Sequence, residues 1–232
     1  MFNISSSNPF NDSQECLLIG LKDTPEKFSG ILTELDAKFE NGLTELVKSG
    51  DLSAKLKEIS KVHTLGKIAS KRLVFIGLGK EKDLKFDEIK EAFGKAFKFV
   101  NKNRLQSAAV ALDTFVTESL SHDDVANALS EAFALATYEF AGYKQKSNEP
   151  EKKIEQLSIF TEADKDEIEA ALTVGYAFGK ATNSARTLVN LPGNMLTATE
   201  LAHYAEEVAK KYGKMLSVSS AKELPLILGD IH

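Results

Sequence analysis

The sequence KRLVFIGLGK, residues 71–80, decides the fold class of this chain. Its centre, Leu73–Gly79, is a continuous apolar run without alternating polar residues. A strand with one solvated face alternates with a period of two, whereas a strand covered on both faces stays apolar throughout. The stretch therefore predicts a central strand of a sheet that has helices on both faces.

Apolar runs and helical patterns alternate along the rest of the chain. Further strands are predicted at Cys16–Ile19, Ala108–Leu112 and Leu157–Phe160, with an edge strand within Lys57–Leu65. Apolar residues recur at helical spacing over 31–39, 87–100, 121–140 and 164–189, with a break near Asn41-Gly42 and a cap at Ser121. This alternation predicts an α/β domain with a largely parallel or mixed sheet.

Composition narrows the classes of function. The net charge is −5, with both signs interspersed, so no basic stripe indicates a nucleic-acid partner. No run approaches the length that a membrane span needs, and residues 1–10 lack the basic start of a secretory signal. Cys16 is the single cysteine; it is expected to be a buried strand thiol in a protein of the reducing cytoplasm.

The turn Gly77-Leu78-Gly79-Lys80 partly matches a loop that cradles phosphate. The third glycine of a dinucleotide fingerprint is missing, because Lys82 stands at that spacing and Asp83 follows it. Glu81, rather than serine or threonine, follows the lysine. Acidic residues at this position would repel phosphate, so the pattern favours a plain turn at the end of a strand.

No constellation of side chains typical of catalysis or metal binding occurs in the sequence. The four histidines, His63, His122, His203 and His232, lack partners at the spacing that places two ligands on one helix face. Ser107 and Ser184 have no neighbouring base that would activate a nucleophile. We therefore predict no catalytic, cofactor-binding or metal-ligating residue in this chain.

A helix stop and restart lies at RTLVNLPGNMLT, residues 186–197, followed by Glu200. Pro192 ends one helix, and Thr197 with Glu200 forms a capping box for the next. The string resembles the "R-x-L-V-N-x-P-x-N-x-L-T" segment of the leucyl aminopeptidases, peptidase family M17, where it joins the amino-terminal domain to the catalytic domain. Residues 71–80 and Tyr138–Lys144 also resemble that family.

The resemblance implies an amino-terminal domain of macro-domain type, a catalytic domain as its partner, and a hexamer. It also implies two divalent metals, zinc or manganese, which serve the release of amino-terminal residues from peptides. The family's two metal-ligand segments do not occur in these residues. We therefore expect a macro-like domain over 1–160, a connecting helix over 161–191, and a truncated start of the catalytic domain over 192–232.

On this interpretation the chain is the non-catalytic portion of an aminopeptidase, expected to be inactive alone and to serve domain packing or oligomer assembly. One alternative is a stand-alone macro-like module that binds a nucleotide or ADP-ribose-type ligand at Gly77-Leu78-Gly79. Another is a fragment retained purely for assembly. The sequence leaves these alternatives open.

Overall fold

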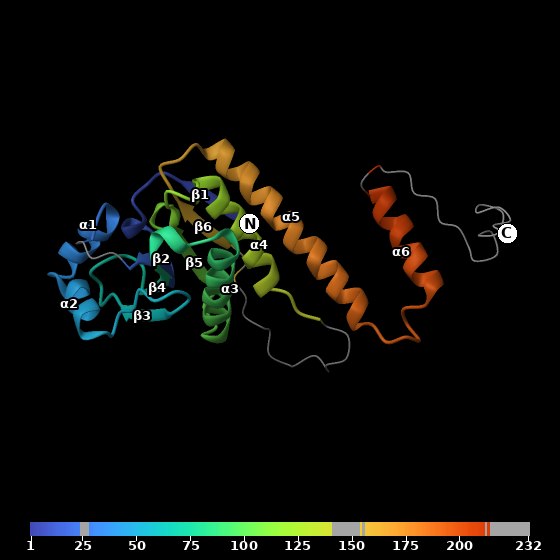
Figure 1. Ribbon diagram of the computed structural model, residues 1–232, viewed down its shortest axis with the longest axis horizontal. Coiled ribbons are helices and arrows are strands. Elements are labelled where there is room, and N and C mark those ends of the chain that lie inside the picture. The colour runs from blue at the N-terminus through green and yellow to red at the C-terminus, as the bar shows by residue number, and fades with distance from the viewer. Residues whose placement is uncertain (24–27, 141–153, 155, 212, 214–232) are drawn as a thin grey trace. The chain divides into compact units, whose positions relative to one another are not determined.

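The protein is described by a computed structural model that covers residues 1–23, 28–140, 154, 156–211 and 213 (Figure 1). One sheet has the order β1-β6-β5-β2-β4-β3. Its strands are β1 (Phe2–Ser5), β2 (Cys16–Lys22), β3 (Ile59–His63), β4 (Arg72–Gly79), β5 (Ser107–Ala111) and β6 (Gln156–Phe160). All neighbours are parallel except β3, which pairs antiparallel with β4 at one edge. The predicted α/β class with a mixed sheet is confirmed.

Helices connect the strands and cover both faces of the sheet (Figure 1). They are α1 (Ile31–Lys38), α2 (Gly42–Ser49), α3 (Phe86–Lys102), α4 (His122–Ala136), α5 (Lys165–Asn190) and α6 (Ala198–Lys211), with short 3-10 turns η1 (Pro9–Asn11), η2 (Glu81–Asp83) and η3 (Leu112–Phe115). The predicted cap of α4 is present, since Ser121 Oγ accepts the backbone N–H of Asp124. Helix α3 begins one residue before the predicted Asp87, with Lys85 as its N-cap.

The continuous apolar run of β4 is explained by two separate cores. Val74 and Ile76 face the core that α3, α4 and α5 cover. Leu73 and Phe75 face the opposite core, which α1 and α2 cover. Because successive strand residues point to opposite faces, a strand buried on both sides must be apolar at every position.

The strand β1 was missed by the sequence analysis. Phe2–Ser5 contains two polar residues in four and lies at a sheet edge, parallel to β6. An edge strand is only partly buried, so its sequence does not need the apolar run that revealed β4. Phe2 packs edge-on against Phe133 and Tyr176, which anchors this strand to α4 and α5.

The chain forms two compact units. The first holds the sheet with α1 to α4, and includes α5 as far as Ser184; the second holds, of the described residues, Phe140 and the chain from Ala185 to Lys211, including α6, with Gly213. In the second unit, Thr197 Oγ1 accepts the backbone N–H of Glu200, which is the predicted cap of α6. The sequence from Tyr143 to Gln156 is charged and contains Pro150, which indicates a loop; most of it, and the tail from Leu224, lie outside the described residues. Within the described part of the chain, no helix combines the length and apolarity required to cross a bilayer.

Candidate functional site

A pocket lies at the carboxyl ends of the parallel strands. In the sheet, β2 lies between β4 and β5. The connection that leaves β2 runs toward the side of β4, whereas the connection that leaves β5 runs to β6 on the other side. Connections that diverge from two neighbouring strands leave a crevice outside their carboxyl ends. A pocket of about 770 Å³ occupies this position. It is lined by Ser6, Ser7, Asn8, Pro9, Gly20, Leu21, Lys22, Phe28, Ser29, Gly30, Ile31, Leu32, Glu34, Glu81, Ala111, Asp113, Thr114, Phe160, Thr161 and Glu162.

The floor of the pocket is held rigidly by Thr114 in η3. Its hydroxyl accepts the backbone N–H of Gly20 at 2.8 Å and donates to the carbonyl of Ala111 at 2.7 Å. A side chain at Gly20 would lie 2.7 Å from the Thr114 carbonyl oxygen, so only glycine fits here. The ends of β2 and β5 are thereby fixed relative to each other.

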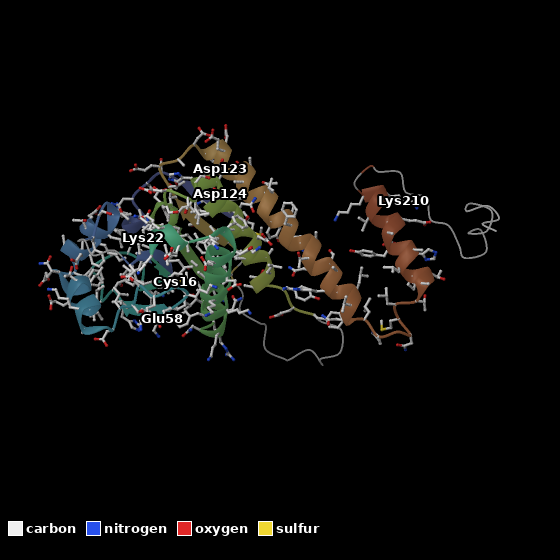
Figure 2. All side chains as sticks on the ribbon, in the orientation of Figure 1. Cys16, Lys22, Glu58, Asp123, Asp124 and Lys210 are labelled. Carbon is white, nitrogen blue, oxygen red and sulfur yellow. The ribbon has the colours of Figure 1, made fainter. Side chains whose placement is uncertain are left out.

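The charged side chains of the pocket are mostly acidic. Lys22, labelled in Figure 2, is the one lysine among the described residues that line it; its ammonium lies 3.1 Å from Glu81 and also donates to the carbonyl of Val116. Asp113 accepts from the Thr161 hydroxyl at 2.5 Å and from the backbone N–H of Glu162 at 3.1 Å. These bonds fix the Asp113 carboxylate at the pocket wall.

The glycine turn proposed as a nucleotide site does not line this pocket. Gly77–Gly79 belongs to β4 itself, and a Cβ at Gly77 would lie 2.0 Å from the carbonyl oxygen of Lys55. Gly77 exchanges backbone hydrogen bonds with Lys57 and Glu58, each at 2.8 Å. The glycine therefore permits close approach of the segment before β3, and the expected turn lies within the strand.

The histidines do not converge in the described residues. His122 Nε2 lies 3.3 Å from Asp113, while His63 stands on the edge strand β3 and His203 on α6. His232 lies outside the described residues. Among the residues that are described, no group of three or more histidine, cysteine, aspartate or glutamate side chains could hold a metal ion. The metal pair implied by the resemblance therefore has no fitting ligand set in this part of the chain.

Cys16 and Ser107 have structural roles. Cys16 is fully buried in β2, and burial, followed by the charge of Glu15, raises the pKa of its thiol to about 12. A thiol that stays protonated is a poor nucleophile, and the prediction of a buried strand cysteine is confirmed. Ser107 Oγ accepts the backbone N–H of Glu15 at 3.0 Å, which ties β5 to the start of β2.

The sequence analysis missed the polar residues that surround the pocket. Lys22, Asp113 and Thr161 each follow an apolar strand segment directly or within two residues. Because parallel strands end at one edge of the sheet, such positions are brought together by the topology. Polar residues directly after apolar strands therefore indicate a site, but the sequence analysis considered only Gly77–Lys80 in this way.

A second surface feature lies on α5 within the first unit. Its inner side packs against α4: a Cβ at Gly175 would lie 2.1 Å from the Asn127 carbonyl oxygen, and Leu172 is 1% exposed. On the opposite side, Phe178 is 61% and Val174 is 47% exposed. We call this side the outer stripe; it consists of the exposed residues Ala170, Val174, Ala177, Phe178 and Ala181.

Comparison with solved structures defines the class of this α/β domain. The fold matches a mutant of tomato leucine aminopeptidase with a TM-score of 0.78 and 20% identity, over 98% of this chain and 46% of that one. It also matches the macrodomain of Mycobacterium tuberculosis DarG with a TM-score of 0.52 and 14% identity, over 69% of this chain and 98% of that one. The domain thus has the macro-like fold found in leucine aminopeptidase.

Sequence comparison identifies the family. The model of the cytosol aminopeptidase family, N-terminal domain, matches residues 18–147. The chain is also 46% identical over 217 residues to the probable cytosol aminopeptidase of Bacillus subtilis (strain 168), which covers 92% of this chain and 43% of that protein. The chain belongs to the cytosol aminopeptidase family, M17, and carries its N-terminal domain. It spans less than half the length of this relative.

Proposed function

We propose that this chain is the non-catalytic part of a metal-dependent aminopeptidase and acts as a docking domain for the catalytic part. The intact protein would release amino-terminal residues from peptides with the help of two divalent metals, and would act in the cytoplasm as a homo-oligomer. Domain boundaries near residues 160 and 191 belong to the same proposal. The observation that carries it is the outer stripe of α5.

The outer stripe has more apolar surface than a solvated helix needs. Between Ala170 and Ala185, α5 contains one charged residue, Lys180. A helix that is apolar on all sides is normally covered on all sides, and exposed apolar patches mark sites of interaction. The inner side already packs within the first unit, so the outer stripe remains exposed. It is the surface to which the catalytic part would bind; that part corresponds to the portion of the Bacillus subtilis relative that this chain does not match.

Two experiments test the proposal. First, the purified chain is assayed for hydrolysis of leucine p-nitroanilide with added manganese or zinc; we expect no turnover above a mock purification. Second, the chain is mixed with the separately expressed portion of the Bacillus subtilis relative that this chain does not match. Binding measured by calorimetry is expected, and Phe178→Asp should weaken it by about tenfold or more, because it places a charge in an apolar interface.

The matched control is Thr173→Asp, an exposed position of the same helix beside the outer stripe. It adds the same charge without removing an apolar side chain, and should weaken binding much less. Equal effects of the two variants would refute docking through the outer stripe. Metal-dependent turnover by the purified chain alone would refute its non-catalytic role.

A further inference from the structure

The pocket at the carboxyl ends of β2, β5 and β6 has the properties of a small-molecule site. Its volume of about 770 Å³ lies within the range of roughly 300–1,000 Å³ that is usual for such sites. It occupies the place where open α/β sheets bind ligands. The docking function proposed above uses a different surface, so it leaves this pocket without a role.

The charge of the pocket indicates the sign of the charge that a ligand should carry. Among the described residues that line it, four carboxylates, from Glu34, Glu81, Asp113 and Glu162, stand against one ammonium from Lys22, which gives 1 − 4 = −3. The charge of Lys22 is already compensated by Glu81 at 3.1 Å. A concave site lined by one sign of charge concentrates ligands of the opposite sign. A nucleotide or another phosphate ester is therefore disfavoured, and a cation is favoured.

The individual carboxylates differ in how far the protein compensates them. Glu34 accepts two bonds from the Asn8 amide at 3.2 Å and lies 3.6 Å from Lys38. Asp113 accepts from the neutral hydroxyl of Thr161 and from a backbone N–H, with the His122 ring 3.3 Å away. The exposed carboxylate of Glu162 forms no ion pair with any described residue. Glu162 is thus the most available partner for an external cation.

The spacing of these groups determines the shape of the ligand. The four acids come from α1, η2, η3 and the end of β6, and no three of the described carboxylates are close enough to share one metal ion. Between them the lining is mixed: polar groups such as Ser29 and Thr114 alternate with the apolar side chains of Leu21, Leu32 and Phe160. Separated carboxylates with apolar side chains among them match a ligand whose positive charges are separated by short hydrocarbon segments.

We propose that this pocket binds an aliphatic polyamine, a linear chain in which methylene segments separate ammonium groups. The ammonium groups pair with Glu162, Asp113 and Glu34, and the methylene segments lie against the apolar side chains among them. The same alkylammonium chemistry is present in a lysine side chain, so a basic peptide is the second possible source of the ligand.

The test is isothermal titration calorimetry of the full chain with spermidine, trilysine, ADP-ribose and manganese chloride as separate probes. Spermidine is expected to bind with one-to-one stoichiometry. Glu162→Gln should weaken this binding about fivefold, because one ion pair in a solvated site contributes on the order of 1 kcal/mol. Raising the salt to about 1 M should weaken it further, since the screening length falls to about 3 Å.

The matched control is Glu58→Gln, which makes the same change of charge at an exposed residue that does not line the pocket (Figure 2). It should change the affinity less than about twofold. Circular dichroism melting shows that each variant is folded. If trilysine binds more tightly than spermidine, a basic peptide side chain is the source of the ammonium groups.

Three results would overturn the proposal. The first is no spermidine binding up to about 10 mM, which would limit the binding free energy to less than about 3 kcal/mol. The second is an equal effect of Glu162→Gln and Glu58→Gln, which would place the binding elsewhere. The third is tighter binding of ADP-ribose or of manganese than of spermidine. Tighter binding of ADP-ribose would contradict the negative charge inferred for the pocket, and tighter binding of manganese would contradict the separation of its carboxylates. None of these outcomes depends on whether α5 docks a catalytic domain.

Discussion

The two sides of α5 both consist mainly of small and apolar residues, but one side is buried and the other is exposed. The inner side is built from Leu172, Gly175 and Gly179, all buried, and the outer stripe from Val174, Phe178 and alanines, all exposed. Glycine on the inner side lets α4 approach so closely that no added Cβ would fit. The comparison teaches that apolar composition alone does not show whether a helix face belongs to the fold or to an interaction.

Replacing one side chain by alanine on each side of α5 should give the largest difference in stability between the two sides. Leu172→Ala removes a side chain from the closed core and should lower the free energy of unfolding by about 3 kcal/mol. Phe178→Ala removes a larger side chain from the exposed side and should change it by less than about 0.5 kcal/mol. Urea unfolding of both variants measures this contrast, and a similar loss in both would mean that the isolated chain already covers the outer stripe.

Glycine substitution tests the close approach of α4 and α5. Gly175→Ala should destabilise the chain by about 2 kcal/mol, because its Cβ would lie 2.1 Å from the Asn127 carbonyl oxygen. Gly94→Ala in α3, where no atom lies within 4 Å of the added Cβ, should instead stabilise it by about 0.5–1 kcal/mol. Thermal melting of the pair gives the sign of each change. Stabilisation by Gly175→Ala would show that the two helices are further apart.

The smallest expected effect on the inner side concerns a polar contact. Asn183 donates from Nδ2 to the Ala134 carbonyl at 2.7 Å, in a buried position. Asn183→Ala should cost about 1 kcal/mol, since it removes a buried hydrogen bond. Thr182→Ala, at the neighbouring exposed position, should cost less than about 0.5 kcal/mol. Chemical denaturation with both variants would decide whether the inner contact with α4 extends as far as Asn183.

The sequence predicted most of the fold because its central strands are buried on both faces. β2, β4, β5 and β6 each appear as apolar runs, and Ser121 marks the start of α4. The edge strand β1 escaped prediction, because edge positions carry no obligatory apolar pattern. The family was predictable from residues 186–197, where a proline turn and a cap occur in a specific order.

The pocket was not predicted, because its residues are far apart in the sequence. Asn8, Lys22, Asp113 and Thr161 come together only when the strand order is known. The glycines of β4 gave a misleading signal: Gly77 serves the close approach of Lys55 rather than the binding of a ligand. A glycine indicates that atoms come close, and only the structure shows which atoms they are.

The burial of Cys16 has a practical consequence for labelling. Since it is the only cysteine of the chain and its thiol is both enclosed and protonated, the native protein should resist maleimide reagents at neutral pH. A cysteine introduced at an exposed position such as Thr173 would then be the one reactive handle, with no need to replace the native residue. Fluorescent or spin probes could therefore be attached next to the outer stripe in an otherwise unaltered protein.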